Sequence, residues 1–361
     1  MTTLSGKQWR ELVHEPPIDP ELPIVDAHHH VWDASPLPDI EAYGLDALLS
    51  DKAGSGHNIV ATVSVDCRTN YRDTGPEHLR LLGETEYIER IANEANRRGG
   101  RYAGACAAIV ATANLLDGAA VGEVLDMHRA LSGRVRGIRL LTAFDESFPA
   151  PPGRTPGIPD RTPGMIMRSD FREGFAELVK RGMTYDAWVF HPQLDEVIDL
   201  ARAFPTARII LNHLGGPIVG GRYGDDKLAA FADWRRRITA VAACNNVVLK
   251  VGGLNMKHAG VSAIGRERPR TSIENAAAQR DYILAGVEAF GPARCMFMSN
   301  FPVDMRGISY TVLWNVFKLV TQGFSAHERS DMFANVAART YDIRLPANVA
   351  PIAPALARGG R

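Results

Sequence analysis

The chain has 361 residues, 45% of them hydrophobic, so it can bury a large core as two ordinary domains or as one large α/β barrel. Its 41 basic residues balance its 41 acidic residues, which argues against nucleic acids and anionic membranes as partners. Any preference for a charged ligand must therefore be local.

The cysteines, the N-terminal segment and the length of the apolar runs indicate a cellular location. Cys67, Cys106, Cys244 and Cys295 are far apart in sequence, lack CxxC spacing and mostly lie in apolar runs, so we expect buried free thiols of a reducing compartment. The N-terminal segment lacks the apolar core of a signal peptide, and no stretch reaches the ~18 uninterrupted apolar residues of a membrane span. The expectation is a soluble, cytoplasmic protein.

Short apolar runs alternate with helical segments, as in a parallel sheet built from strand–helix units. The expected strands are 24–28, 59–65, 102–110, 135–141, 184–190, 207–212, 247–252 and 294–299. The expected helices lie near 79–98, 117–131, 171–182, 193–204, 226–243, 274–290, 309–320 and 326–339. Eight cycles, with no GxGxxG after the first strand, predict an α/β fold of the (β/α)8 TIM-barrel type over residues 22–345.

Three segments fall outside this alternation. Residues 1–21 are expected to be an N-terminal extension, and residues 346–361 a flexible tail or a strap onto a neighbouring subunit. Residues 142–169 are rich in Pro and Gly and predict a long loop after the fourth strand. Because barrel active sites form at the carboxyl ends of the strands, this loop is predicted to be a lid or a substrate contact, with a plain insertion as the alternative.

The first strand ends in DAHHHVWD. Since side chains alternate along a strand, His28 and His30 share one face and are close enough to bind one metal ion. A histidine-rich turn without chemistry is the alternative.

The later strands also end in polar residues. These are Asp66, Arg139, His191, Asn212, His213, Lys250, Ser299, Asn300 and Asp304. A buried imidazole needs hydrogen-bond partners that an apolar core does not supply, so several of them at one barrel mouth predict a functional site.

Each candidate has a structural alternative. His191 could be a metal ligand or a catalytic base, or could cap the next helix, and His213 could belong to the site or anchor the Gly-Gly turn. Arg139 could bind an anion or form a buried ion pair. Asp66 and Lys250 could bind substrate or pair with each other across the barrel.

The motifs DAHHHVWD, GRVRGIR, FHPQL, ILNHLGGP, SNFPVD and FANVAARTYDI occur in an order that resembles the amidohydrolase superfamily. The likeness covers roughly residues 22–345 and is strongest to the amidohydrolase-2 branch, which contains sugar-lactone and aromatic-pathway lactone hydrolases. It implies a hydrolase that opens a lactone or related cyclic ester and acts on a small, carboxylated substrate. Whether the protein forms a homo-oligomer stays open. Arg139, Arg154 and Arg161 are predicted to hold the substrate carboxylate.

The resemblance also implies site residues. His28, His30 and His191 match the ligands of one divalent metal ion, usually Zn²⁺, and His213 matches a sixth-strand site histidine. Asn300 stands where the family has an aspartate that binds the metal or acts as the base. Either Asp304, a histidine or the metal alone would then activate the water, although some relatives work without a metal.

Two other functions stay open, and so does another role for Asp304. The same branch contains metal-dependent decarboxylases of aromatic or unsaturated carboxylic acids, and a barrel without the eighth-strand aspartate could bind a ligand without turning it over. Asp304 could also cap the final helix from a turn after Pro302.

Overall fold

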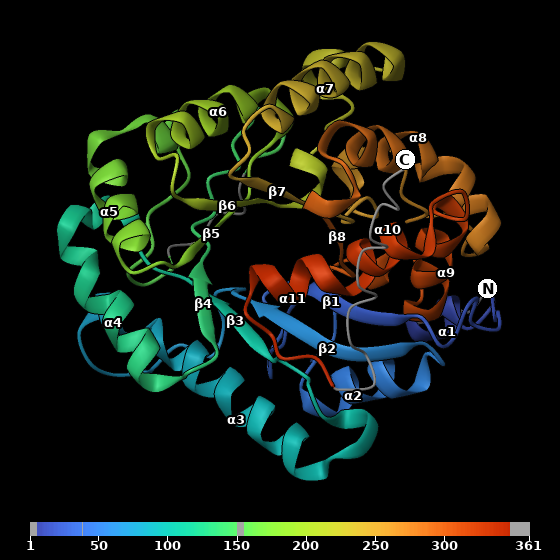
Figure 1. Cartoon of the computed structure of the whole chain (residues 1–361), viewed down its shortest axis with the longest axis horizontal. Coiled ribbons are helices and arrows are strands. Elements are labelled where there is room, and N and C mark those ends of the chain that lie inside the picture. The colour runs from blue at the N-terminus through green and yellow to red at the C-terminus, as the bar shows by residue number, and fades with distance from the viewer. Residues whose placement is uncertain (1–5, 38, 150–154, 347–361) are drawn as a thin grey trace, which may run out of the picture.

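The structure is a computed structural model that describes residues 6–37, 39–149 and 155–346. Eight parallel strands form one sheet in chain order, and the ring that they make is nearly closed (Figure 1). The strands are β1 (Pro23–His29), β2 (Asn58–Val65), β3 (Ala108–Ala111), β4 (Val135–Ile138), β5 (Thr184–Ala187), β6 (Arg208–Leu211), β7 (Val247–Val251) and β8 (Cys295–Phe297). This confirms the predicted (β/α)8 barrel.

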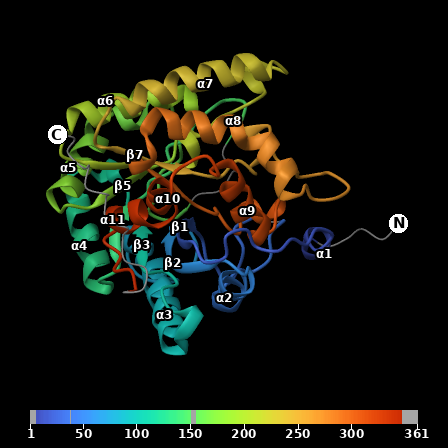
Figure 2. The same cartoon turned by 45° about the vertical axis from the view of Figure 1, so that its right-hand side comes forward.

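Helices surround the ring of strands, as Figures 1 and 2 show. They are α1 (Gly6–Arg10), α2 (Leu45–Gly54), α3 (Leu82–Arg98), α4 (Val121–Leu131), α5 (Ser169–Lys180), α6 (Leu194–Ala203), α7 (Lys227–Ala242), α8 (Ser272–Phe290), α9 (Tyr310–Val320), α10 (Ala326–Ser330) and α11 (Val336–Thr340). Thr271 begins α8 with a capping box, in which its hydroxyl accepts from the Glu274 amide and the Glu274 carboxylate accepts from the Thr271 amide.

Several elements differ from the prediction: α1 was not predicted, the predicted helix 326–339 is divided into α10, a π-helical turn and α11, and α2 and β3 also differ. Helix α2 was not predicted, because its ten residues bury only the short apolar stripe of Leu48 and Leu49. Strand β3 begins at Ala108 rather than at residue 102, because Gly104 and Cys106 have left-handed φ angles of 78° and 50° that interrupt an extended chain.

Hydrogen bonds between β1 and the segment after β8 close the ring. The His30 amide donates to the Phe301 carbonyl (2.7 Å), and the Asn300 amide donates to the His28 carbonyl (2.8 Å). Both histidines of the first strand are therefore fixed beside the end of the eighth strand.

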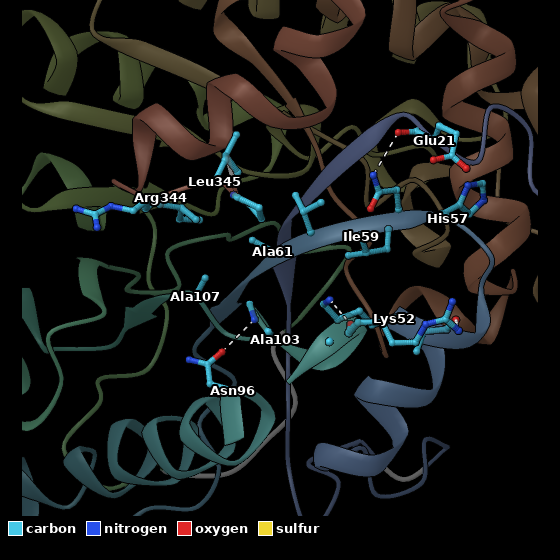
Figure 3. A pocket seen from close by; sticks show the side chains of 18 of the residues that line it. Glu21, Lys52, His57, Ile59, Ala61, Asn96, Ala103, Ala107, Arg344 and Leu345 are labelled. Atoms are coloured by element: carbon cyan, nitrogen blue, oxygen red, sulfur yellow. Dashed lines mark hydrogen bonds between the residues drawn. The ribbon is translucent and has the colours of Figure 1, made fainter. Parts of the chain in front are cut away.

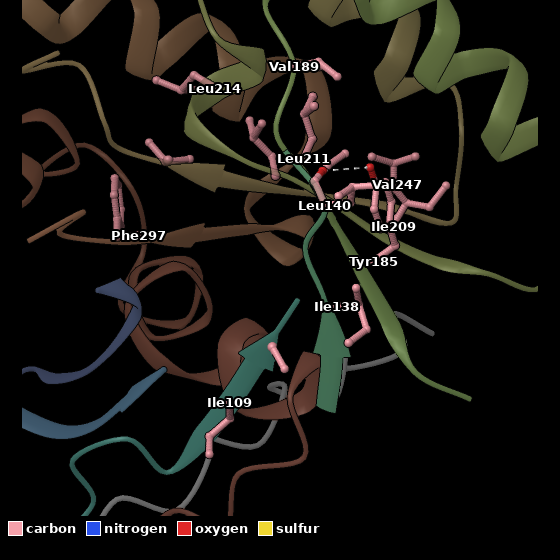
Figure 4. Close-up of a cluster of buried hydrophobic side chains, with 14 of the residues drawn as sticks. Ile109, Ile138, Leu140, Tyr185, Val189, Ile209, Leu211, Leu214, Val247 and Phe297 are labelled. Atoms are coloured by element: carbon pink, nitrogen blue, oxygen red, sulfur yellow. Dashed lines mark hydrogen bonds between the residues drawn. The ribbon is translucent and has the colours of Figure 1, made fainter. Parts of the chain in front are cut away.

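Apolar side chains fill the layer between the strands and the helices (Figure 4). The ring of Tyr185 on β5 lies against Phe171 and Phe175 of α5, with centroids 5.9 and 5.5 Å apart. Because strand side chains alternate, Asp186, the next residue, faces the barrel interior.

The C-terminal segment closes the amino-terminal end of the barrel. The π-helical turn Asp331–Asn335 and α11 pack against inward-facing residues of the strands, and α11 lies across the ring in Figure 1. From just beyond α11, the Tyr341 hydroxyl donates to the Asp186 carboxylate (2.9 Å). Polar chemistry is thus confined to the carboxyl ends of the strands.

The N-terminal extension packs on the barrel from residue 6 onward. The Trp9 indole donates to the Arg266 carbonyl (2.9 Å), and the buried Lys318 ammonium donates to the Ile18 carbonyl (2.9 Å). Residues 347–361 of the predicted tail lie outside the described residues.

The four cysteines are unpaired, which confirms the prediction of free thiols. In the part of the chain that the structure describes, no helix is both long and apolar enough to cross a lipid bilayer.

The aromatic cluster beneath β8 gives a stability prediction. Phe333 is fully buried, and its ring lies 4.7 Å from that of Phe297. Phe333→Ala should lower the free energy of unfolding by about 3–5 kcal/mol, because it leaves a cavity in a packed core. Urea unfolding measures the change. Leu228→Ala, at a site 83% exposed, is the control and should change stability by less than about 0.5 kcal/mol.

Candidate active site

Three imidazoles meet at the carboxyl ends of β1 and β6. The ring centroid of His28 lies 4.9 Å from that of His30 and 4.8 Å from that of His213. Trp188, just beyond β5, packs edge-on against His213 at 4.4 Å. The structure therefore brings together three of the four predicted site histidines.

Two cations flank the central ring, His28. The Arg139 guanidinium lies 3.3 Å from Nε2 of His28, and the Lys250 ammonium lies 3.4 Å from Nδ1. Arg139 pairs with Asp66 (2.7 Å), and Lys250 pairs with Asp186 (2.6 Å). The alternative that Asp66 and Lys250 pair with each other is wrong, because each has a nearer partner of opposite charge.

Burial keeps the imidazoles neutral. It lowers the pKa of His28, His30 and His213 well below the usual value. The charge of Arg139 lowers all three pKa values further, and that of Lys250 lowers those of His28 and His213. Neutral rings are the form that can accept a proton from an attacking water.

The backbone holds His213 in an unusual conformation. Its φ is 54° and that of Leu214 is 53°, both left-handed, which costs about 1–3 kcal/mol per residue. A Cβ on Gly253 would lie 2.4 Å from Nδ1 of His213, so only glycine fits after β7. Nδ1 of His213 has no hydrogen-bond partner among the described residues.

His191 has other neighbours. Its Nδ1 accepts from the Ile218 amide (3.1 Å), and its Nε2 lies 2.7 Å from the Tyr223 hydroxyl and 3.6 Å from the Asp233 carboxylate of α7. Burial lowers the pKa of His191 to about 4. Both ring nitrogens are engaged, and no contact joins this ring to the other three within the described ranges.

The eighth-strand residues form a hydrogen-bonded turn. Asp304 Oδ1 accepts from the Asn300 side chain (2.8 Å), and Oδ2 accepts from the amide and side chain of Asn255 (3.2 and 3.1 Å). Asn300 itself has a left-handed φ of 55°. Asp304 therefore positions Asn300 and the loop after β7. The alternative that it caps the final helix is wrong, because Ser309 caps α9 and Ser325 caps α10.

Access to this cluster is narrow. His28, Lys250, Asp66 and Asp186 are 0% exposed, whereas His30, Arg139 and His213 retain 3–4%. A separate cavity of about 1360 Å³ lies at the opposite end of the barrel, beside Glu21, Lys52 and Ala61 (Figure 3). The chemistry-bearing residues are therefore not those that line this cavity.

The long loop after β4 is anchored to its neighbours. The Phe144 amide donates to the Gln193 side chain (2.8 Å), and Asp145 pairs with Arg222 (2.8 Å). Arg161 donates to the Ala143 carbonyl (3.1 Å). Arg154 lies outside the described residues.

The donor set does not fit the zinc site that the resemblance implies. A metal needs unprotonated nitrogens aimed at one position, and a neutral imidazole has one such nitrogen. The Arg139 guanidinium and the Lys250 ammonium are donors only, and they face Nε2 and Nδ1 of His28, so the lone pair of this ring already faces a donor whichever nitrogen carries it. In the ranges that the structure covers, no three His, Cys, Asp or Glu side chains are arranged to hold an ion.

Two residues of the cluster escaped sequence reasoning. Asp186 stands inside TYDAWVF, and Tyr341 inside RTYDI. Asp186 could have been found from the sequence. A single carboxylate on the inward face of a strand needs a cation as its partner, and Lys250 is the single ammonium in β7, so the two could have been paired.

Comparisons with known proteins agree with this fold. Residues 25–343 match the amidohydrolase family. An uncharacterized protein of Sinorhizobium fredii, y4mH, is 31% identical over 337 residues, which are 90% of this chain and 99% of that protein. An L-fucono-1,5-lactonase of Burkholderia multivorans is 32% identical over 184 residues, 50% of this chain and 58% of that enzyme.

A solved structure of a Burkholderia multivorans amidohydrolase with bound zinc has a TM-score of 0.66 and 23% identity. The match covers 89% of this chain and 99% of that one. It shows that the two proteins share the barrel fold.

The buried Asp304 carboxyl gives a prediction on pH. Burial raises its pKa to about 6, above the value of 3.8 for a free aspartate, so its contribution to stability is present below about pH 4 and is lost as the pH rises through about 6. Asn cannot ionise. Between about pH 4 and pH 7, the unfolding free energy of Asp304→Asn should therefore gain about 2–3 kcal/mol relative to wild type.

Urea unfolding at several pH values measures this difference. Asp225→Asn, at an exposed position, is the matched substitution and should leave stability nearly unchanged. A difference between wild type and Asp304→Asn that does not vary with pH would contradict the prediction.

Proposed function

This chain belongs to the amidohydrolase family and is an enzyme, and from that premise we propose that it is a hydrolase that opens a lactone or related cyclic ester. The observation that carries the proposal is the meeting of three neutral imidazoles with the Arg139 guanidinium at one end of the barrel. The partial likeness to an L-fucono-1,5-lactonase supports the choice of ester.

The residues suggest how the ring opens. Water attacks the lactone carbonyl and gives a proton to a neutral imidazole, for which we propose His213 because its ring reaches the surface of the site, whereas His28 is fully buried. Arg139 stabilises the negative charge that develops on the carbonyl oxygen. The ring oxygen leaves with a proton, and the product is a hydroxy carboxylate plus one released proton.

Basic side chains near the site favour a small carboxylated substrate. Nε and Nη2 of Arg68, which follows β2, are buried without a partner in the described part of the chain, and so is Nε of Arg161. Buried guanidinium donors without partners are costly, and a substrate carboxylate would satisfy them. Arg68 thus joins Arg139 and Arg161 as a proposed substrate contact.

The donor set does not fit the zinc ion that the resemblance implies, and no step of the proposed mechanism depends on a metal. Proposed catalytic roles for His191, Asn300 and Asp304 stay predictions, as does a role in substrate binding for Asp66 and Lys250. The cytoplasmic location and the oligomeric state are open to measurement.

A lactone panel tests the proposal. Sugar 1,5-lactones and pyrone carboxylates are mixed with the purified protein, and ring opening is followed by proton release with an indicator dye. We expect turnover of at least one carboxylated or polyhydroxylated lactone. Carbon dioxide release from an aromatic acid without lactone opening would favour a decarboxylase, and ligand binding without turnover would favour a binding protein; either result contradicts the proposal.

The imidazole that accepts the proton has its own test. His213→Gln should lower kcat by about 10²–10⁴-fold, because glutamine cannot take a proton, while the fold is retained. His128→Gln is the control: His128 is equally buried but lies between Thr85 and the Thr112 carbonyl on α4, so its loss should affect stability and spare turnover. Equal turnover in His213→Gln and wild type would remove His213 from the mechanism.

A further inference from the structure

Both ring nitrogens of His28, the central histidine of the site, already face the side chains of cations. His28 is 0% exposed, and its two ring nitrogens face the nearest nitrogens of Arg139 and Lys250 at 3.3 and 3.4 Å. In a barrel whose relatives are usually metal-dependent, this is the position at which positive charge is needed to polarise a carbonyl or a water.

Each of the two cations beside His28 is already paired with a carboxylate. Arg139 and Lys250 contribute two positive charges, and their partners Asp66 and Asp186 contribute two negative ones. The imidazoles add no charge, and the carboxylate of Asp304 is held by the amides of Asn300 and Asn255. A divalent ion at His28 would therefore add buried positive charge beside two existing cations, while the nearby carboxylates of Asp26 and Asp304 already accept hydrogen bonds from their neighbours.

We infer that Arg139 and Lys250 replace a metal ion at His28, so that this enzyme has no resident metal and its own side chains supply the positive charge of the site. The two cations have different parts in this arrangement. Arg139 retains 4% exposure and can reach a substrate oxygen, whereas Lys250 is fully buried.

Lys250 is accordingly a positioning residue. Its ammonium is held by Asp186, which in turn accepts from Tyr341 (2.9 Å), and it faces Nδ1 of His28. The ring of His28 is thereby fixed between two cations, with Nε2 directed at Arg139. The catalytic part of the inference, that Arg139 polarises the substrate, rests on the proposed lactone hydrolysis; the exclusion of metal does not.

Zinc binding tests the inference without any substrate. The full-length protein, purified without added metal, is dialysed against a series of zinc concentrations, and zinc per chain is measured by mass spectrometry. We expect wild type to bind far less than one zinc per chain at micromolar zinc. One zinc per chain that disappears in His28→Ala would overturn the inference.

Paired substitutions show whether the two cations are the reason why zinc does not bind at His28. Arg139→Met/Asp66→Asn and Lys250→Met/Asp186→Asn each remove one cation with its partner, so no unpaired buried charge remains. Each should tighten zinc binding by about tenfold or more, because a cation beside His28 is gone. Two independent pairs keep the test valid where one of them fails to fold.

The matched control is Arg134→Met/Glu89→Gln, which removes a partly buried ion pair between α3 and the segment before β4, outside the site. It should leave zinc binding at the wild-type level. No gain in zinc affinity in a folded site variant would overturn the inference. Failure of the lactone panel would leave these zinc measurements unaffected, so the two proposals fail separately.

Discussion

The two ion pairs on either side of His28 are the constraint on which the site depends. Arg139 with Asp66 joins β4 to the end of β2, and Lys250 with Asp186 joins β7 to β5, all inside the barrel. Taking four charges out of water is costly, and such pairs stabilise a fold less than apolar residues of the same volume would. Their presence in an otherwise apolar interior therefore points to a role at the site. Substituting one partner alone would leave an unpaired buried charge, so both members of a pair have to be substituted together.

The same network links the closed end of the barrel to the open end. Tyr341 follows α11, which closes the amino-terminal end, and its hydroxyl donates to the carboxylate that holds Lys250. A chain of polar contacts thus runs from Tyr341 through Asp186 and Lys250 to His28, from the C-terminal segment up to the imidazoles. The C-terminal segment that follows β8 consequently fixes the geometry of residues on β5 and β7, far from it in sequence.

Periodicity and strand ends predicted much of this arrangement, and closure of the barrel decided the rest. Alternation showed that His28 and His30 share a face, and polar strand ends identified Arg139, His213 and Lys250. Alternation shows which face of a strand a residue lies on, but not its position along the barrel axis relative to residues of the other strands. The partners of Lys250 and Asp66 could therefore not be derived from the sequence. His128 shows a second limit: its helix was predicted, but nothing in the sequence indicated that this polar residue is fully buried between two threonines.

The end of the eighth strand is the reason why we assign proton transfer to the imidazoles. An aspartate at position 300 would place a carboxylate beside His30, whereas Asn300 brings an amide whose side chain is held by Asp304. That carboxylate in turn accepts from Asn255, so it joins the loops after β7 and β8 and has no oxygen left for a water. With the eighth-strand carboxylate used in this way, the groups that remain at the surface of the site are His30, His213 and Arg139. Two neutral bases and one permanent cation can together take a proton from water and stabilise an oxyanion, which is the minimum that opening an ester ring requires.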